Sequence, residues 1–178
     1  MTPRNLPTLP GGELTDGIVS LRPMTAADAA EVHPVRSSPD VVAYTVTRVA
    51  PTAAETADYC ARAQAVWREG RSVRLTVRDA ATGAFAGKAG LQIEEPGSTE
   101  AEIDYYLAAA WRGRGYATRA VTLLCRWALR DTPIERLVAA VHVTNPDSQR
   151  VLTRTGFVRD GQMGGLYTYA LTVTPPRR

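Results

Sequence analysis

Alternating apolar and polar residues predict three consecutive strands in the middle of the chain. In the first, Val73, Leu75 and Val77 alternate with arginine and threonine, as expected of a strand that buries one face. Short turns that contain glycine separate the three segments, which indicates an antiparallel meander. The predicted strands cover residues 72–79, 85–93 and 101–107.

Helix signals precede this meander. Thr25 and Asp28 have the spacing of a capping box, which predicts a helix start. That helix is expected to end at His33, because Pro34 interrupts it. A second, short helix is expected over residues 40–44.

Two longer helices show an apolar stripe at helical spacing. The first starts at a capping box of Thr52 and Glu55 and ends at Gly70. Its predicted stripe consists of Ala57, Ala61 and Ala65. The second follows the meander, and its predicted stripe consists of Ala117, Ala120, Val121, Leu124 and Ala128.

The remaining segments complete an alternation of strands and helices. Residues 18–22 predict a first strand, residues 135–143 a buried strand, and residues 157–173 one or two more. Asn145 and Gly156 are typical of the two ends of a helix. The order predicts an α/β (α+β) fold, with a mixed, mostly antiparallel sheet of six to seven strands and helices on both faces.

The length of 178 residues and the 44% of hydrophobic residues predict one domain, over residues 17–174. Residues 1–16 are rich in proline, glycine and threonine and lack periodicity, so we expect a flexible arm. Residues 175–178 are expected to form a tail. The net charge of +3 suits an anionic ligand but does not by itself indicate nucleic acid.

The sequence offers little for a metal centre or a disulfide. Cys60 and Cys125 make no C-x-x-C pair, and His33 and His142 lie far apart, so no metal site is predicted. No apolar run reaches the roughly 18 residues of a membrane span. No apolar stretch near residue 1 resembles a secretory signal. We therefore expect a cytoplasmic protein without a membrane partner.

The segment W-R-G-R-G-Y-A-T-R-A (residues 111–120) connects a predicted strand to a predicted helix. Its glycines let backbone N–H groups approach a bulky anion, and a helix N-terminus favours negative charge. A tight turn with solvated arginines explains the residues equally well. A dinucleotide fingerprint fails because Thr118 stands at the third glycine, and no G-K-[ST] of a P-loop follows. One copy between regular elements disfavours a nucleic-acid motif.

The wider sequence makes this segment more specific. R-G-R-G-Y-A (residues 112–117) matches a Q/R-x-x-G-x-G/A signature, preceded by A-E-I-D-Y-Y-L-A-A-A-W and followed by N-P-D-S-Q-R-V-L-T-R-T-G-F. L-R-P-M-T-A-A-D near the start and T-G-x-x-x-G at residues 82–87 extend the match. Over about residues 18–161 the chain resembles the GNAT acyl-CoA-dependent N-acetyltransferases, and within them the Rim-type branch with its ribosomal-protein N-terminal acetyltransferases.

The resemblance implies the GNAT fold, whose fourth and fifth strands, here residues 101–107 and 135–143, splay apart. It implies acetyl-CoA as the acetyl-donor cosubstrate, with no metal. The pantetheine arm would lie between the splayed strands, at Leu107 and Asn145, and Arg154 could meet the adenosine phosphate. The pyrophosphate would lie at the start of the following helix, on the backbone of Arg112, Gly113, Arg114, Gly115, Tyr116 and Ala117, with Thr118 close by.

Acetyl transfer needs a base to deprotonate the amine and an acid to protonate the thiolate. Glu102 and Asp104 project to one face of a strand. Glu102 matches a family glutamate, which implies that it is the base, acting through a water, and a surface or salt-bridged carboxylate pair is the alternative. The family's tyrosine before G-F is missing here. Ser148 matches a serine of Rim-type enzymes and is the implied acid, with helix capping as its alternative. Other candidates for the acid are Tyr105, Tyr106, Tyr167 and Tyr169.

The resemblance predicts an N-acetyltransferase that acts on an amine of a protein N-terminus or of a small molecule. One alternative is an acyl-CoA sensor of the GNAT fold without turnover, which the missing tyrosine favours and Glu102 disfavours. A basic nucleic-acid binder is a third possibility, and we expect no nucleic acid partner. Homodimers are common in the family, and nothing in the sequence displays an interface. The acceptor stays open.

Overall fold

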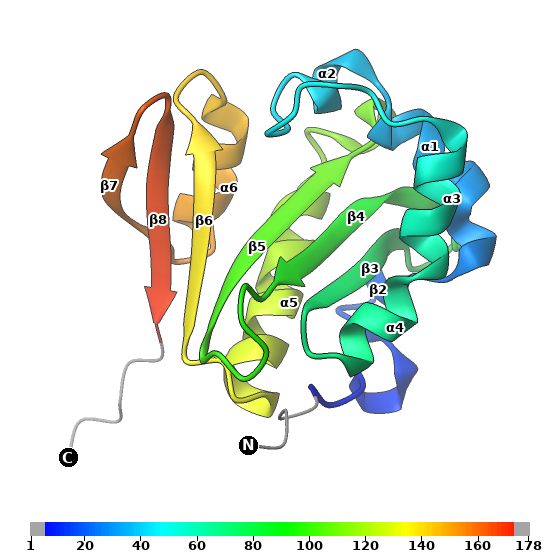
Figure 1. Ribbon diagram of the computed structural model, residues 1–178, viewed down its shortest axis with the longest axis horizontal. Coiled ribbons are helices and arrows are strands. Elements are labelled where there is room, and N and C mark those ends of the chain that lie inside the picture. The colour runs from blue at the N-terminus through cyan, green and yellow to red at the C-terminus, as the bar shows by residue number, and fades with distance from the viewer. Residues whose placement is uncertain (1–5, 173–178) are drawn as a thin grey trace.

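The structure, a computed structural model, describes residues 6–172. Within this range eight strands form one sheet, in the order β1-β2-β3-β4-β5-β6-β8-β7 (Figure 1). All neighbouring strands are antiparallel except β5 and β6, which are parallel. The strands are β1 Leu14–Thr15, β2 Val19–Pro23, β3 Ser72–Asp79, β4 Phe85–Gln92, β5 Glu100–Leu107, β6 Arg136–His142, β7 Val158–Met163 and β8 Leu166–Thr172.

Helices cover both faces of the sheet (Figure 1), as the sequence predicts. On one face lie α1, α3 and α4, on the other α5 and α6, while α2 lies near one end. The helices are α1 Ala29–Arg36, α2 Pro39–Val42, α3 Ala53–Ala61, α4 Ala63–Arg68, α5 Tyr116–Asp131 and α6 Pro146–Arg154. Short 3-10 turns cover Pro10–Gly12, Ala26–Asp28 and Ala109–Trp111.

The larger core lies between α5 and the sheet. Ala120, Val121, Leu124 and Ala128 of the predicted stripe are buried there, against the apolar faces of β2 to β6. Trp127 of the same helix meets Trp67 of α4 edge to face, with 5.8 Å between the ring centroids. The period of the α5 sequence therefore predicts its buried face correctly.

A smaller core lies under α1 and α3, and here the predicted stripe is wrong. Ala57 and Ala61 are exposed, whereas Thr56 and Cys60, one position earlier in each turn, are buried. Thr56 and Cys60 are larger than Ala57 and Ala61 and fill more of the space above the sheet, so they set the orientation of the helix. The cluster consists of Met24, Val32, Cys60 and Ala63.

Two helix boundaries also differ from the prediction. The helix α1 continues through Pro34 to Arg36, because Val32 is fully buried and Ser37 bonds the carbonyl of His33 through its N–H (3.0 Å) and its hydroxyl (2.7 Å). The predicted long helix is divided at Arg62, which keeps a near-helical backbone. Both capping boxes form as predicted.

The described part of the predicted flexible arm is packed onto the domain. Leu6 and Leu9 are buried in the larger core, and the short strand β1 adds an eighth strand to the six or seven expected. Asp16 is tied to Arg119 of α5 by an ion pair of 2.7 Å. Isolated leucines in an irregular segment carry no period, so the pattern could not place them. The predicted tail lies outside the described residues.

Leu124→Ala tests the packing of α5. Leu124 is 0% exposed, so its truncation leaves a cavity, and we expect the free energy of unfolding to fall by about 2–5 kcal/mol. Chemical denaturation followed by circular dichroism measures this change. Arg126→Ala, on the exposed side of the same helix, is the matched control and should change stability by less than about 0.5 kcal/mol. Equal effects of the two substitutions would contradict the packing described.

Candidate functional site

The parallel strands β5 and β6 pair along only the first part of β5. Beyond this stretch the two strands diverge (Figure 1), which is the splay that the sequence predicts for its fourth and fifth strands. On its other side β5 stays paired with β4 along its length. The three paired positions are Glu100 with Arg136, Ala101 with Leu137 and Glu102 with Val138.

Backbone groups of β5 face the splay. The N–H of Ala108, just after β5, donates to the carbonyl of Ala86 on β4 (2.9 Å), and the backbone groups of successive residues in a strand point to opposite sides. The backbone groups of Tyr105 and Leu107 therefore point toward β6, where it has separated. The carbonyl of Leu107 accepts bonds from Nε (3.1 Å) and Nη2 (2.8 Å) of Arg112. The N–H of Leu107 also points into the splay, beyond the last paired position of β5 and β6.

The glycine loop that follows β5 forms an open turn. Gly113 (φ 71°) and Gly115 (φ 78°) adopt the left-handed conformation, and a Cβ at either position would meet no atom within 4 Å. Gly115 precedes the first residue of α5, and no side chain caps this end. The first bond into the helix runs from Arg119 to the carbonyl of Gly115 (3.1 Å). The earlier N–H groups of α5 are thus available to a ligand.

The side chain of Tyr116 anchors the start of α5 to β3. Its hydroxyl donates to Oδ2 of Asp79 (2.5 Å), and its ring packs beside Trp111, with 5.0 Å between the centroids. This hydrogen bond, together with bonds from Thr82, lowers the pKa of Asp79. Tyr116 is buried, so only its backbone can contact a ligand in the loop.

The arginine side chains of the loop are held by the protein. Arg112 pairs with Asp40 of α2 and also bonds the carbonyl of Leu107. The guanidinium of Arg114 lies 5.5 Å from the centre of the Trp111 ring. An anion in the loop would therefore meet backbone N–H groups first, as the sequence suggests.

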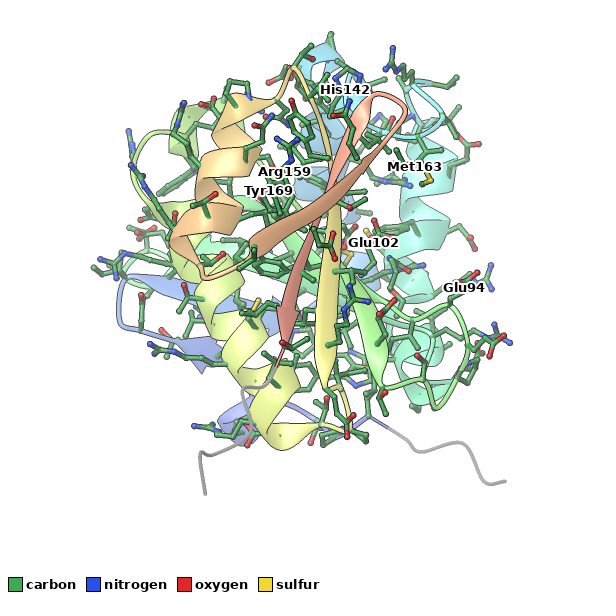
Figure 2. The ribbon with its side chains drawn as sticks, turned by 90° about the vertical axis from the view of Figure 1, so that its left-hand side faces the viewer. Glu94, Glu102, His142, Arg159, Met163 and Tyr169 are labelled. Atoms are coloured by element: carbon green, nitrogen blue, oxygen red, sulfur yellow. The ribbon has the colours of Figure 1, made fainter. Side chains whose placement is uncertain are left out.

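One face of β5 carries carboxylates. Glu102, Asp104 and Tyr106 are two residues apart, so all three point to the face of the sheet that α1 and α3 cover. Figure 2 shows Glu102 beside the middle of β6. Asp104 forms an ion pair with Lys88 of β4. Glu102 forms no ion pair or hydrogen bond with residues 6–172, and desolvation, followed by repulsion from Asp104, raises its pKa. Of the two carboxylates, Glu102 is the unpaired one.

The opposite face of β5 carries a hydroxyl pair. The hydroxyl of Tyr105 lies 2.7 Å from Oγ of Ser148 on α6. Desolvation raises the pKa of Tyr105 to about 12. Asn145 caps α6 by accepting a bond from the N–H of Ser148 (3.2 Å), so the hydroxyl of Ser148 itself does not cap. Glu102 and Ser148 thus approach the splay from opposite faces of the sheet.

Within residues 6–172, the other candidate residues form no side-chain hydrogen bond with Glu102, Tyr105 or Ser148. Arg154 is exposed on the last turn of α6, at the opposite end of that helix from Asn145. It borders an open hollow of about 380 Å³ on α6 and β8. Tyr106 is partly buried, and its buried hydroxyl has no hydrogen-bond partner among the described residues. The Tyr167 ring lies under Arg159, at 3.7 Å from its guanidinium carbon, and Tyr169 is buried.

A contact that the sequence did not reveal borders the splay. The loop after α2 reaches the end of β6, where Nη2 of Arg48 lies 3.2 Å from Nε2 of His142 and the hydroxyl of Tyr44 donates to the carbonyl of Thr144 (3.3 Å). Figure 2 places His142 at that end of the strand. These pairs are separated by some hundred residues, so no local pattern could predict them.

Among residues 6–172, no group of three or more His, Cys, Asp or Glu side chains could hold a metal ion. Cys60 and Cys125 are free and buried. No helix in the described range is long and apolar enough to cross a membrane.

Comparison with known proteins identifies relatives over most of the fold. A family model described as "Acetyltransferase (GNAT) domain" matches residues 19–158. The ribosomal-protein-serine acetyltransferase of Escherichia coli (strain K12) is 33% identical over 67 residues, which are 38% of this chain and 37% of that enzyme. The matches to curated relatives cover between 33% and 47% of their lengths.

Solved structures show the same fold at low identity. RimL, described as a ribosomal L7/L12 alpha-N-protein acetyltransferase in complex with coenzyme A, has a TM-score of 0.79 at 18% identity, covering 90% of this chain and 96% of its own. AAC(6')-Ib in complex with ribostamycin and coenzyme A has a TM-score of 0.75 at 20% identity, covering 88% and 94%.

Tyr116→Phe tests the anchor of α5. Loss of the hydrogen bond should raise the pKa of Asp79 toward its ordinary value, which carboxyl NMR titration measures. The lowered pKa of Asp79 stabilises the folded protein at pH values above about 3.9, the pKa of an aspartate in the unfolded chain. This contribution is lost as the pH falls through the lower pKa of the folded state. The variant should therefore be less stable than wild type at neutral pH, with a difference that shrinks below about pH 4.

Tyr167→Phe is the matched control, because Tyr167 lies on β8 and is not among the groups that shift the pKa of Asp79. It should leave the titration of Asp79 unchanged. If Asp79 titrated alike in Tyr116→Phe and wild type, the anchoring bond would be refuted.

Proposed function

The chain belongs to the GNAT acetyltransferase family, and we propose that it transfers the acetyl group of acetyl-CoA to a primary amine by direct attack on the thioester. The observation that carries this proposal is the coincidence of two features at one end of β5. The strand parts from β6 beside an unpaired glutamate, and it leads directly into an open glycine turn at the start of a helix.

The glycine turn supports a pyrophosphate site. Gly113 and Gly115 leave space that a Cβ would fill, and the first N–H groups of α5 lack a cap. Backbone donors at a helix N-terminus suit phosphate oxygens. We assign this site to the backbone from Arg112 to Ala117, with Thr118 close by.

The splay supports a pantetheine site. Amide groups of an extended arm could pair with the free N–H of Leu107 and the backbone of Tyr105, as a further strand would. The side-chain oxygen of Asn145 is engaged in capping α6, so its amide nitrogen is the atom we assign to a pantetheine carbonyl. Arg154 is the weaker assignment, since it lies at the far end of α6.

Glu102 has the properties expected of the base. A primary amine is mostly protonated at neutral pH, so it must lose a proton before attack. A carboxylate whose pKa is raised accepts a proton more readily near neutral pH, and burial and Asp104 raise the pKa of Glu102. Glu102 would act through a water, and another backbone N–H of β5 at the splay would polarise the acetyl carbonyl.

Ser148 and Tyr105 together suit the acid step. Their hydroxyls form one hydrogen-bonded pair, so a proton given up by Ser148 can be replaced from Tyr105. The pair lies on the face of β5 opposite to Glu102. Base and acid on opposite sides of the splay would let the amine approach from one face while the thiolate leaves on the other.

Two classes of acceptor fit the family. RimL is described as an alpha-N-protein acetyltransferase, and AAC(6')-Ib is described in complex with ribostamycin, a small molecule. We propose a primary amine of either class, bound between the early helices and the C-terminal strands. A screen of peptide N-termini and small amines, with thiol release as the readout, tests the proposal and identifies the class.

Gly115→Trp tests the cofactor site. The indole would fill the open turn, so acetyl-CoA affinity measured by calorimetry should fall by at least about tenfold while the domain stays folded. Gly97→Trp is the matched control, since Gly97 also has a positive φ (91°) and open space around its Cβ, but lies between β4 and β5. Unchanged affinity in Gly115→Trp would show that the pyrophosphate binds elsewhere.

Glu102→Gln tests the base. Turnover should fall by about 10²- to 10⁴-fold with little change in acetyl-CoA affinity, because only proton removal is affected. Glu100→Gln is the control on the same strand face, where Glu100 pairs with Arg136 (2.7 Å). Undiminished turnover in Glu102→Gln would exclude it as the base. No thiol release from wild type with any amine would instead favour an acyl-CoA sensor.

A further inference from the structure

Lys88 stands apart from every other basic residue of the chain. Of the 21 lysine and arginine residues it is the only lysine, and its position in the middle of β4 is 1% exposed. Burying an ammonium is costly unless it is paired. Its burial would lower its pKa, but the attraction of Asp104, together with Tyr59, outweighs this and the pKa is raised. The buried side chain is therefore a cation.

A glycine makes room for the contact between Lys88 and Asp104. Gly90 lies directly opposite Asp104 in the pairing of β4 with β5. A Cβ at residue 90 would overlap the carbonyl oxygen of Val73 on β3, and it would lie 2.9 Å from Nζ of Lys88 and 3.2 Å from Oδ1 of Asp104. Because the glycine has none, the ammonium can reach the carboxylate across the strand surface.

Asp104 in turn connects this cation to Glu102. The two carboxylates are two residues apart on one strand face, and repulsion from Asp104 contributes to the raised pKa of Glu102. Asp104 has its counter-ion in Lys88, whereas Glu102 has none among residues 6–172. Other charged or titratable groups around the pair come from four elements: Arg36 on α1, Tyr59 and Cys60 on α3, Arg74 on β3 and Tyr106 on β5.

We propose that Lys88 is a positioning residue, which compensates the charge of Asp104 so that Glu102 can lose its proton and act as the base. This inference rests on the proposed function. A lysine suits the position, because its ammonium is compact where an arginine fork would need more space beside Gly90. Without Lys88 the full charge of Asp104 would act on Glu102 and keep it protonated to higher pH.

Lys88→Met tests this role. The substitution leaves Asp104, whose side chain is 45% exposed, in contact with water, so the fold can tolerate it. Carboxyl NMR titration should show the midpoint of Glu102 moved upward by on the order of one pH unit. In assays, kcat/KM should be reduced most at low pH and return toward wild type as the pH rises, because the base is then deprotonated in both proteins.

The double variant Lys88→Met, Asp104→Asn removes both charges. The midpoint of Glu102 should then fall below that of Lys88→Met, because the repulsion from Asp104 is gone. Asp104→Asn alone keeps Lys88 and should lower the midpoint further than the double variant does, so this second pair isolates the charge of Lys88 if Lys88→Met does not fold. Arg22→Met is the matched control: Arg22 lies on β2 and pairs with Glu13, so its removal should leave the titration of Glu102 unchanged.

An unchanged Glu102 midpoint in the folded variants, even with reduced thermal stability, would overturn the inference and leave Lys88 a structural residue. The titration needs neither acetyl-CoA nor an amine, so it stands apart from the proposed function. If Glu102→Gln kept full turnover while the midpoints moved as expected, the assignment of the base would fail and the charge compensation would hold.

Discussion

The site depends on the early end of pairing between the parallel strands β5 and β6. After Glu102 meets Val138, the backbone groups of β5 on that side lose their strand partner. Unpaired backbone groups away from water are costly, so such an edge is either filled by the protein or kept for a ligand. Arg112 fills part of it by bonding the carbonyl of Leu107. In the proposed function, the remaining groups would pair with an extended arm of the cosubstrate.

Because side chains alternate along β5, the candidate functional residues lie on opposite faces of the sheet. Glu102 points to the face of α1 and α3, where Lys88 compensates its neighbour, and Tyr105 points to the face of α5 and α6, where it meets Ser148. The two faces of the sheet are connected at the place where β5 and β6 separate. In the proposed function, an amine and a thioester would meet at this opening, between a base and an acid on opposite faces of the sheet.

The errors of the sequence analysis have a common cause, since each was decided by contacts distant in sequence. The alanine stripe of α3 is regular but exposed, because Thr56 and Cys60 fit the space above the sheet. Pro34 lies within α1 because the burial of Val32 outweighs the local preference to stop. The arm before residue 16 packs through Leu6 and Leu9, which follow no period.

Patterns local in the sequence determined the strands of the meander, the buried face of α5 and the helix starts at both capping boxes. They also determined the turn before α5, where Gly113 and Gly115 adopt a positive φ. The same patterns placed Glu102 and Asp104 on one face. Only the tertiary structure decided which carboxylate is compensated, that Ser148 meets Tyr105, and that Arg112 bonds the edge of β5. Those pairings join separate elements, and charge and hydrogen-bond partners depend on distances that chain spacing does not fix.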